Sequence, residues 1–245
     1  MGTQTVSWPT GNAPAGQAEG LRERKKRLMR QQLSDTATRM FLERGFDQVR
    51  VAEVAEACGV SEKTVFNYFS TKESLILDRL EATVSSLRTG LADSDRPPVQ
   101  AALQILGREL AGITDWLAGQ DDPSQAAQAI VRFGDLIRVT PSLRAYQSDM
   151  MDQFVTVASE ILAARAGMSP DDPEPRIAAT ALLGLWRIQF RALSKYLDGT
   201  RTPAQVHQAI STEVNRAARL IDTGLRSFPL ITRDTGNPSD APTTS

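Results

Sequence analysis

The feature that most constrains this fold is a recurrence of apolar residues at spacings of three and four. Proline and glycine interrupt the pattern at intervals that fit helix lengths. The clearest apolar seam runs along about five helical turns and consists of Leu143, Tyr146, Met150, Phe154, Val157 and Ile161. Strand-like alternation is missing, and β-branched residues form few clusters. The sequence therefore predicts an all-α protein.

Start and stop signals divide the chain into about nine helices, in a small N-terminal bundle and a larger C-terminal bundle. We expect them at 22–44, 51–58, 61–69, 71–92, 99–117, 124–137, 141–166, 173–196 and 203–228. Residues 1–20 and 229–245 are polar and rich in small residues and proline. Such segments cannot bury enough apolar surface to order themselves, so both tails are expected to be disordered.

The charge distribution is uneven, although the net charge is only −1. Between residues 21 and 30 a single acid, Glu23, is accompanied by six basic residues: Arg22, Arg24, Lys25, Lys26, Arg27 and Arg30. A near-neutral chain with one basic block favours a local contact with a polyanion.

Several absences bear on location and chemistry. The only cysteine, Cys58, cannot form an internal disulfide, which favours a reducing compartment. No apolar run is long enough to cross a bilayer, and residues 1–20 lack the apolar centre of a secretory signal. We therefore expect a cytoplasmic protein with no membrane partner. His207 is the only histidine, which excludes a histidine-rich metal site; we expect no metal and no cofactor.

The stretch GVSEKTVFNYF, residues 59–69, predicts a short helix that its surroundings must hold. Ser61 is a good N-cap for the amide of Thr64. The helix has about two turns, too few to be stable alone in water. Val65 and Phe69 are four residues apart and turn to one side, toward the helix at 51–58. The glycine-containing link between the two helices has the form of a helix-turn-helix.

The opposite face of this helix carries side chains that reach base edges and phosphates: Lys63, Thr64, Asn67 and Tyr68. Phe66 flanks them and is too apolar for an ordinary solvent-facing position. Lys72 stands at the expected start of the next helix, where backbone amides also attract phosphate. The pattern favours DNA binding. A structural helical hairpin with a solvated polar face is the alternative.

Residues 33–75 resemble the DNA-binding domain of the tetracycline-repressor (TetR) family of bacterial regulators. The matching positions are Gly45, Phe46, Val51, Val54, Ala55, Gly59, Val60, Ser61, Thr64, Val65, Phe66, Tyr68, Phe69, Lys72, Glu73 and Leu75. The resemblance implies that Thr64, Tyr68 and Lys72 grip phosphates. Lys63 and Asn67 would face bases, and Ser61 at the helix start is counted with the DNA contacts.

Two departures from the family pattern alter these expectations. The family usually has tyrosine at Phe66; here that phosphate contact is lost or becomes apolar, for instance against a thymine methyl. The family usually has Thr or Ser at Arg50, which cannot cap the second helix. Asp47 is a substitute cap, and Arg50 gains a phosphate contact instead. The basic residues Arg22, Arg24, Lys25 and Lys26 are either a solvated helix start or, as we favour, a DNA contact.

For the C-terminal bundle, the resemblance implies a homodimer through the last two helices and a cavity for a small molecule. The candidate ligand-binding residues are Trp116, Phe133, Tyr146, Met150, Phe154, Trp186, Arg187 and Phe190. Each of them, taken singly, also fits a plain core position. Gln189 and Arg191 are, with Arg187, further candidates to anchor a polar or anionic end of a ligand; Arg138 and Arg144 are weaker candidates.

The chain is thus interpreted as a DNA-binding domain at 21–70 followed by a ligand-binding and dimerisation domain at 71–228. We expect a transcriptional repressor that binds a palindromic DNA operator as a dimer. A small apolar or amphipathic effector of unknown identity would release it, with the helix at 71–92 as the lever. A helical ligand-binding or adaptor protein without DNA function is the alternative. A helical enzyme is less favoured, because no catalytic constellation is found.

Overall fold

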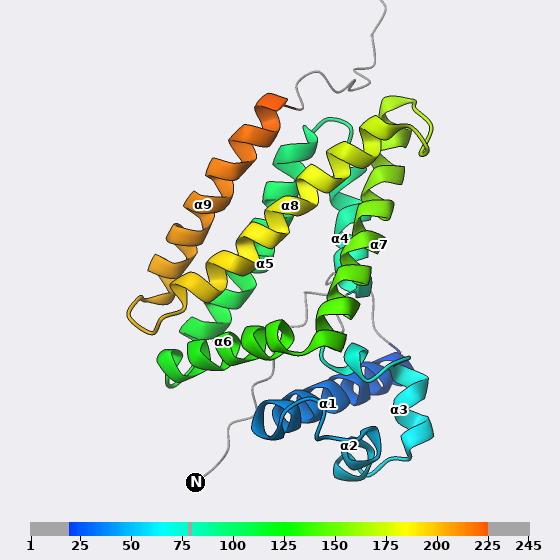
Figure 1. Cartoon of the computed structure of the whole chain (residues 1–245), viewed down its shortest axis with the longest axis vertical. Helices are drawn as coiled ribbons and strands as arrows, with labels where there is room; N and C mark the ends of the chain where they lie inside the picture. The colour runs from blue at the N-terminus through cyan, green and yellow to red at the C-terminus, as the bar shows by residue number, and fades with distance from the viewer. Residues whose placement is uncertain (1–19, 78–79, 225–245) are drawn as a thin grey trace, which may run out of the picture.

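The computed structural model describes residues 20–77 and 80–224, and within these ranges it is built of helices alone (Figure 1). The helices are α1 (Leu21–Arg44), α2 (Val51–Ala57), α3 (Glu62–Tyr68), the 3-10 helix η1 (Glu73–Leu75), α4 (Leu80–Leu91), α5 (Pro98–Ala118), α6 (Pro123–Val139), α7 (Pro141–Ala166), α8 (Pro173–Tyr196) and α9 (Pro203–Gly224). The all-α prediction is confirmed. The tails expected to be disordered lie outside the described residues, except for Gly20. Within the described ranges, every helix is too short or too polar to span a membrane.

Proline at the first helical position starts each of the five helices from α5 to α9. Proline suits this position because its fixed φ matches a helix and its missing N–H would have no helical partner. Asp122 caps α6 by accepting a hydrogen bond from Gln125 N at 2.9 Å. Asp172 occupies the N-cap position of α8 as expected, but its carboxylate accepts from Ser169 N at 2.8 Å and stabilises the preceding turn.

The helix expected from Thr71 to Ala92 is not continuous, which corrects the sequence interpretation. Thr71 and Ser74 form a closed turn in which each backbone N–H donates to the hydroxyl of the other residue, at 3.2 and 3.1 Å. Such local bonds compete with helical ones. Ser34 of α1 then donates its hydroxyl proton to Leu75 O at 2.8 Å. These contacts hold η1 against α1, and the α-helical segment α4 begins only at Leu80.

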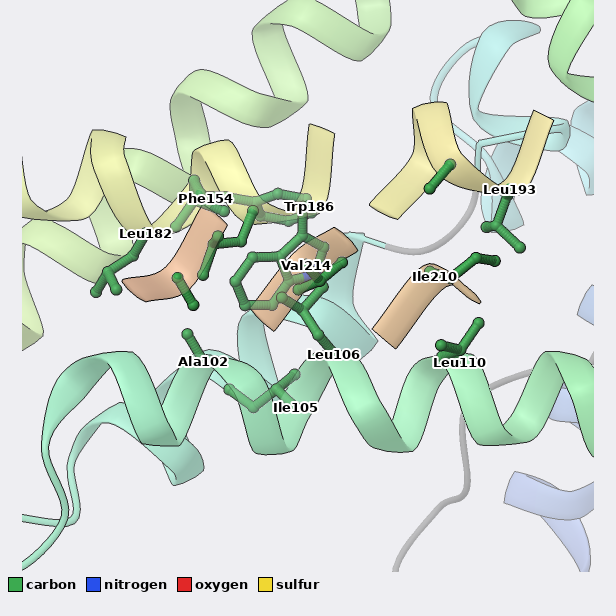
Figure 2. Packing of buried hydrophobic residues seen from close by; sticks show 14 of the residues in the cluster. Ala102, Ile105, Leu106, Leu110, Phe154, Leu182, Trp186, Leu193, Ile210 and Val214 are labelled. Atoms are coloured by element: carbon green, nitrogen blue, oxygen red, sulfur yellow. The ribbon is translucent and has the colours of Figure 1, made fainter. Parts of the chain in front are cut away.

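The C-terminal helices enclose the larger core. Figure 2 shows α5, α7, α8 and α9 converging on Trp186, which is 2% exposed. The seam predicted along α7 is partly displaced. Val157 and Ile161 are only half-buried, whereas their neighbours Ala158 and Leu162 are buried. The displacement follows from packing on two sides, because α7 contacts both α8 and α4.

A second core lies where the N-terminal helices meet the C-terminal ones. It combines residues of α1, α2, α3 and η1 with Ile137 of α6 and Leu143 of α7. Figure 1 shows α1 lying beneath the corner between α6 and α7. The N-terminal bundle therefore does not end its packing at residue 70: the buried side chains continue through Leu75, Ile76 and Leu77.

Candidate nucleic-acid interface

The short helix α3 is fastened to the N-terminal bundle by the two apolar side chains that the sequence predicted. Val65 is 1% exposed and Phe69 is 2% exposed. Ser61 Oγ accepts a hydrogen bond from Thr64 N at 3.1 Å, which confirms the predicted N-cap. Gly59 has φ +68°, the left-handed conformation that ends α2 and allows the tight turn into α3.

The opposite face of α3 is open to solvent. Lys63, Phe66 and Asn67 are exposed, and none of them has a hydrogen bond or ion pair within the described residues. Thr64 and Tyr68 are half-buried beside them; the Thr64 hydroxyl shares a 2.8 Å hydrogen bond with Ser61 Oγ. Figure 1 shows α3 on the outside of its bundle, on the side away from α8 and α9. This face is open to a partner from outside the chain, and its contact with DNA stays a prediction.

Arg30 of α1 supports the other end of α3, a role that charge alone did not reveal. Its Nη1 donates to Tyr68 O at 2.7 Å, and its guanidinium stacks 4.7 Å above the centre of the Phe69 ring. The last carbonyls of a helix lack helical partners and carry partial negative charge. Arg30 therefore satisfies the C-terminal end of α3 and fixes the position of Tyr68.

Lys72 is also turned toward the protein. Its ammonium donates to Phe46 O at 2.6 Å and lies 4.3 Å from the centre of the Phe46 ring and 5.6 Å from that of Phe41. Loss of hydration lowers the pKa of Lys72. The helix start at which Lys72 was expected to bind phosphate is η1, and there the ammonium already has a protein partner. Its phosphate contact stays a prediction.

The start of α2 replaces the missing Thr or Ser cap with a carboxylate from inside the helix. Arg50 is exposed, and its backbone N–H donates to Glu53 Oε2 at 2.8 Å. Glu53 Oε1 accepts from Arg44 Nη2 at 2.8 Å. Glu53, and not Asp47 as expected, therefore satisfies this helix end. The backbone hydrogen bond from Arg50, followed by the bond from Arg44, lowers the pKa of Glu53 from 4.5 to about 2.

This depressed pKa predicts a pH-dependent contribution of Glu53 to stability. The ionised carboxylate is favoured in the folded state, so its contribution is complete above about pH 4.5 and is lost as the pH falls toward about 2. The difference in unfolding free energy between the wild type and Glu53→Ala should shrink over that window, as measured by urea denaturation at stepped pH. Glu56→Ala, which removes an unpaired carboxylate on the same helix, is the control. A Glu53 difference that stays constant from pH 7 to pH 3 would contradict the assignment.

The basic block lies in the first turns of α1, not in an extended arm. Arg22, Arg24, Lys25 and Lys26 are all exposed there. The same stretch exposes two leucines, Leu21 and Leu28. The geometry is that of a solvated helix start, and the DNA contact of these residues stays a prediction.

The eight candidate ligand-binding residues are divided between the two cores and the exposed surface of α8. Phe133 and Tyr146 pack against the N-terminal core, while Trp116 and Met150 pack against the C-terminal core. Phe154 belongs to the C-terminal core itself. Two others, Arg187 and Phe190, are exposed on α8.

Trp186 is a core residue whose indole N–H donates to Glu109 Oε2 at 3.1 Å. A surface depression of about 350 Å³ lies elsewhere, at the turns joining α5 to α6 and α8 to α9. It is lined by Leu117, Asp122, Pro123, Ser124, Ala127, Leu197, Gly199, Thr200, Arg201, Thr202, Pro203 and Val206, and none of the eight candidates is among them.

Comparison with known proteins agrees with this architecture. Residues 33–78 match the family model described as bacterial regulatory proteins of the tetR family, and residues 119–211 match the MftR C-terminal domain. TcmR of Streptomyces glaucescens, an HTH-type transcriptional regulator, is 30% identical over 77% of this chain and 82% of its own length.

Two further comparisons are more distant. The putative mycofactocin biosynthesis transcriptional regulator MftR of Mycobacterium tuberculosis is 27% identical over 67% of this chain and 76% of its own length. The crystal structure of NalD from Pseudomonas aeruginosa is 20% identical, with a TM-score of 0.46 over 78% of this chain and 97% of that one.

The helix-turn-helix formed by α2 and α3 lies within the match at 33–78, and the identity with TcmR extends over 77% of the chain. The matches to family models together cover more than half of the chain. This chain therefore belongs to the TetR family of bacterial regulators and is a DNA-binding transcriptional regulator.

Proposed function

We propose that this regulator is a repressor that binds a palindromic operator as a homodimer and is released by a small apolar or amphipathic effector. The observation that supports DNA binding is the open face of α3, where Lys63 and Asn67 have no partner within the described residues. Val65 and Phe69 are buried on the opposite face and hold the helix in place. Lysine and asparagine suit guanine and adenine edges in the major groove, respectively.

The dimer is proposed through α8 and α9. These helices expose large apolar side chains, Ile177 and Phe190 on α8 and Leu220 on α9. A dimer built on these two helices would remove these apolar side chains from water. A two-fold pair would also place two copies of α3 for a palindromic site, since one recognition helix reads only a few base pairs.

The effector proposal is supported by Gln189 of α8. Its side chain is 4% exposed and makes no hydrogen bond within the described residues. A buried amide without partners calls for a polar group from outside the protein chain, whether water or ligand. Gln189 also lies within the segment 71–228, where the ligand-binding domain is expected. In this proposal, effector binding shifts the C-terminal helices. The shift reaches α3 through α4 or through the packing of Ile137 and Leu143 on the N-terminal core.

Salt-dependent binding of the full chain to duplex DNA from its own upstream region tests the proposal. Affinity supplied by phosphate contacts should fall steeply as salt is raised. No binding to that DNA at low salt, nor to any duplex selected from a random library, would favour the adaptor or ligand-binding alternative. An accompanying measurement of molecular mass in solution tests the dimer.

Asn67→Ala should relax specificity at one base pair of each half-site by about 1–3 kcal/mol. The asparagine amide can pair with a base edge, whereas alanine cannot. Tyr68→Phe should give the opposite pattern. It removes a hydroxyl that is expected to bind a phosphate, so binding to all sequences should weaken equally. Binding measurements against a panel of single-base-pair changes give both patterns. A uniform loss for Asn67→Ala would contradict its base-reading role.

A further inference from the structure

Phe66 is an exposed aromatic side chain on a helix whose other apolar residues are deeply buried. It is 46% exposed, compared with 1% for Val65 and 2% for Phe69. Tyr68 is half-buried and packs against the N-terminal core. The helical position explains the difference: Phe66 is rotated by about 100° from Val65 and cannot reach the same core.

The Phe66 ring has no stacking partner among the described residues. It forms no aromatic pair or cation–π contact with the described part of the chain, whereas Phe41, Phe46 and Phe69 all do. Its neighbours on the open face of α3 include Lys63 and Asn67, and the exposed Glu62 lies one turn before it. This face therefore contains one apolar ring among polar side chains, at the place where the proposed DNA duplex would lie.

The chemistry of the major groove limits what such a ring can contact. Guanine, cytosine and adenine present hydrogen-bonding groups there, and thymine also presents a 5-methyl group. A phenyl ring pressed on the polar groups would take them from water without replacing their hydrogen bonds. Contact with the thymine methyl removes apolar surface from water on both partners. Insertion of an apolar wedge between bases is instead typical of minor-groove binders.

We propose that Phe66 is a specificity-determining residue that packs its ring on the 5-methyl group of one thymine in each half-site. This inference rests on the proposed DNA binding and deepens it. The thymine lies beside the bases that Lys63 and Asn67 face, because the three side chains occupy adjoining positions on one short helix. A phosphate contact is excluded for this residue, because phenylalanine has no hydrogen-bond donor.

The test removes single methyl groups from the DNA. A duplex selected by the full chain from a random library is resynthesised with deoxyuridine replacing thymidine, one symmetric pair of positions at a time. Deoxyuridine keeps every hydrogen-bonding group and lacks only the methyl. At one thymine position, affinity should fall about fourfold for each methyl removed, the effect expected for one buried methyl group. The other thymine positions should change little.

The Phe66→Ala variant should bind the thymidine and deoxyuridine duplexes equally at that position. Phe66→Leu, which keeps an apolar side chain, should retain part of the preference. Val139→Ala, which removes an exposed apolar side chain from α6, should retain all of it.

Two outcomes would overturn the inference while leaving DNA binding intact. One is a wild type that is insensitive to deoxyuridine at every position; the other is a methyl preference that Phe66→Ala keeps in full. Failure to select any duplex would instead count against the proposed function itself. If Phe66→Ala leaves DNA binding unchanged but abolishes association with another protein, the ring belongs to a protein contact and the thymine assignment is wrong.

Discussion

Phe69→Ala is expected to lower the stability of the N-terminal bundle by about 3–5 kcal/mol and to abolish sequence-specific DNA binding. Phe69 is almost wholly buried, and the Arg30 guanidinium stacks 4.7 Å from its ring centre. Removing the ring leaves a cavity and takes a stacking surface from a partly buried cation. Because α3 has only 7 residues, it cannot remain helical without this support. Urea denaturation followed by far-UV circular dichroism, with DNA binding measured in parallel, checks the prediction.

Phe66→Ala is the matched control for the stability measurement. It removes the same side chain three residues earlier, from the exposed face of the same helix. Its effect on stability should stay within about 0.5 kcal/mol, as for other surface substitutions. Equal destabilisation by the two variants would show that the two faces of α3 have been assigned wrongly.

The buried and exposed faces of α3 could be predicted because its short sequence allows few arrangements. A two-turn helix with apolar residues four positions apart has one inward face, and the remaining positions must then point outward. Val65 and Phe69 are accordingly buried, and Lys63 and Asn67 exposed. The limits of the longer helices were predictable for a similar reason, because proline is tolerated at a first helical position and not in the interior.

The direction in which a charged side chain points was not predictable. Lys72 and Arg30 both belong to positions that a charge count assigns to a polyanion. In the structure, both are bound to backbone carbonyls and aromatic rings of the protein itself. Long basic side chains can cover apolar surface and still find acceptors, so sequence spacing does not tell whether they face DNA or the bundle.

The division of the candidate ligand-binding residues between two cores was not predictable for a different reason. Apolar and aromatic residues at helical spacing show that a face is buried, but they do not show against which helices. The sequence interpretation therefore placed Phe133 and Tyr146 in one predicted cavity with Trp186, although they pack against the N-terminal core. The turn at Thr71–Ser74 was missed because its hydroxyl bonds depend on a competition between local and helical hydrogen bonds.

Trp186→Ala should destabilise the C-terminal core by about 3–5 kcal/mol, because the indole fills the centre where α5, α7, α8 and α9 meet (Figure 2). Trp186→Phe keeps much of the volume and removes the donor to Glu109, 3.1 Å away, so its loss should be smaller. Trp116→Ala is the control, since that indole is only half-buried. Thermal unfolding of the three variants checks the order. If Trp186→Ala instead left stability unchanged and altered only the response of DNA binding to added small molecules, Trp186 would line a ligand cavity and would not be part of the core.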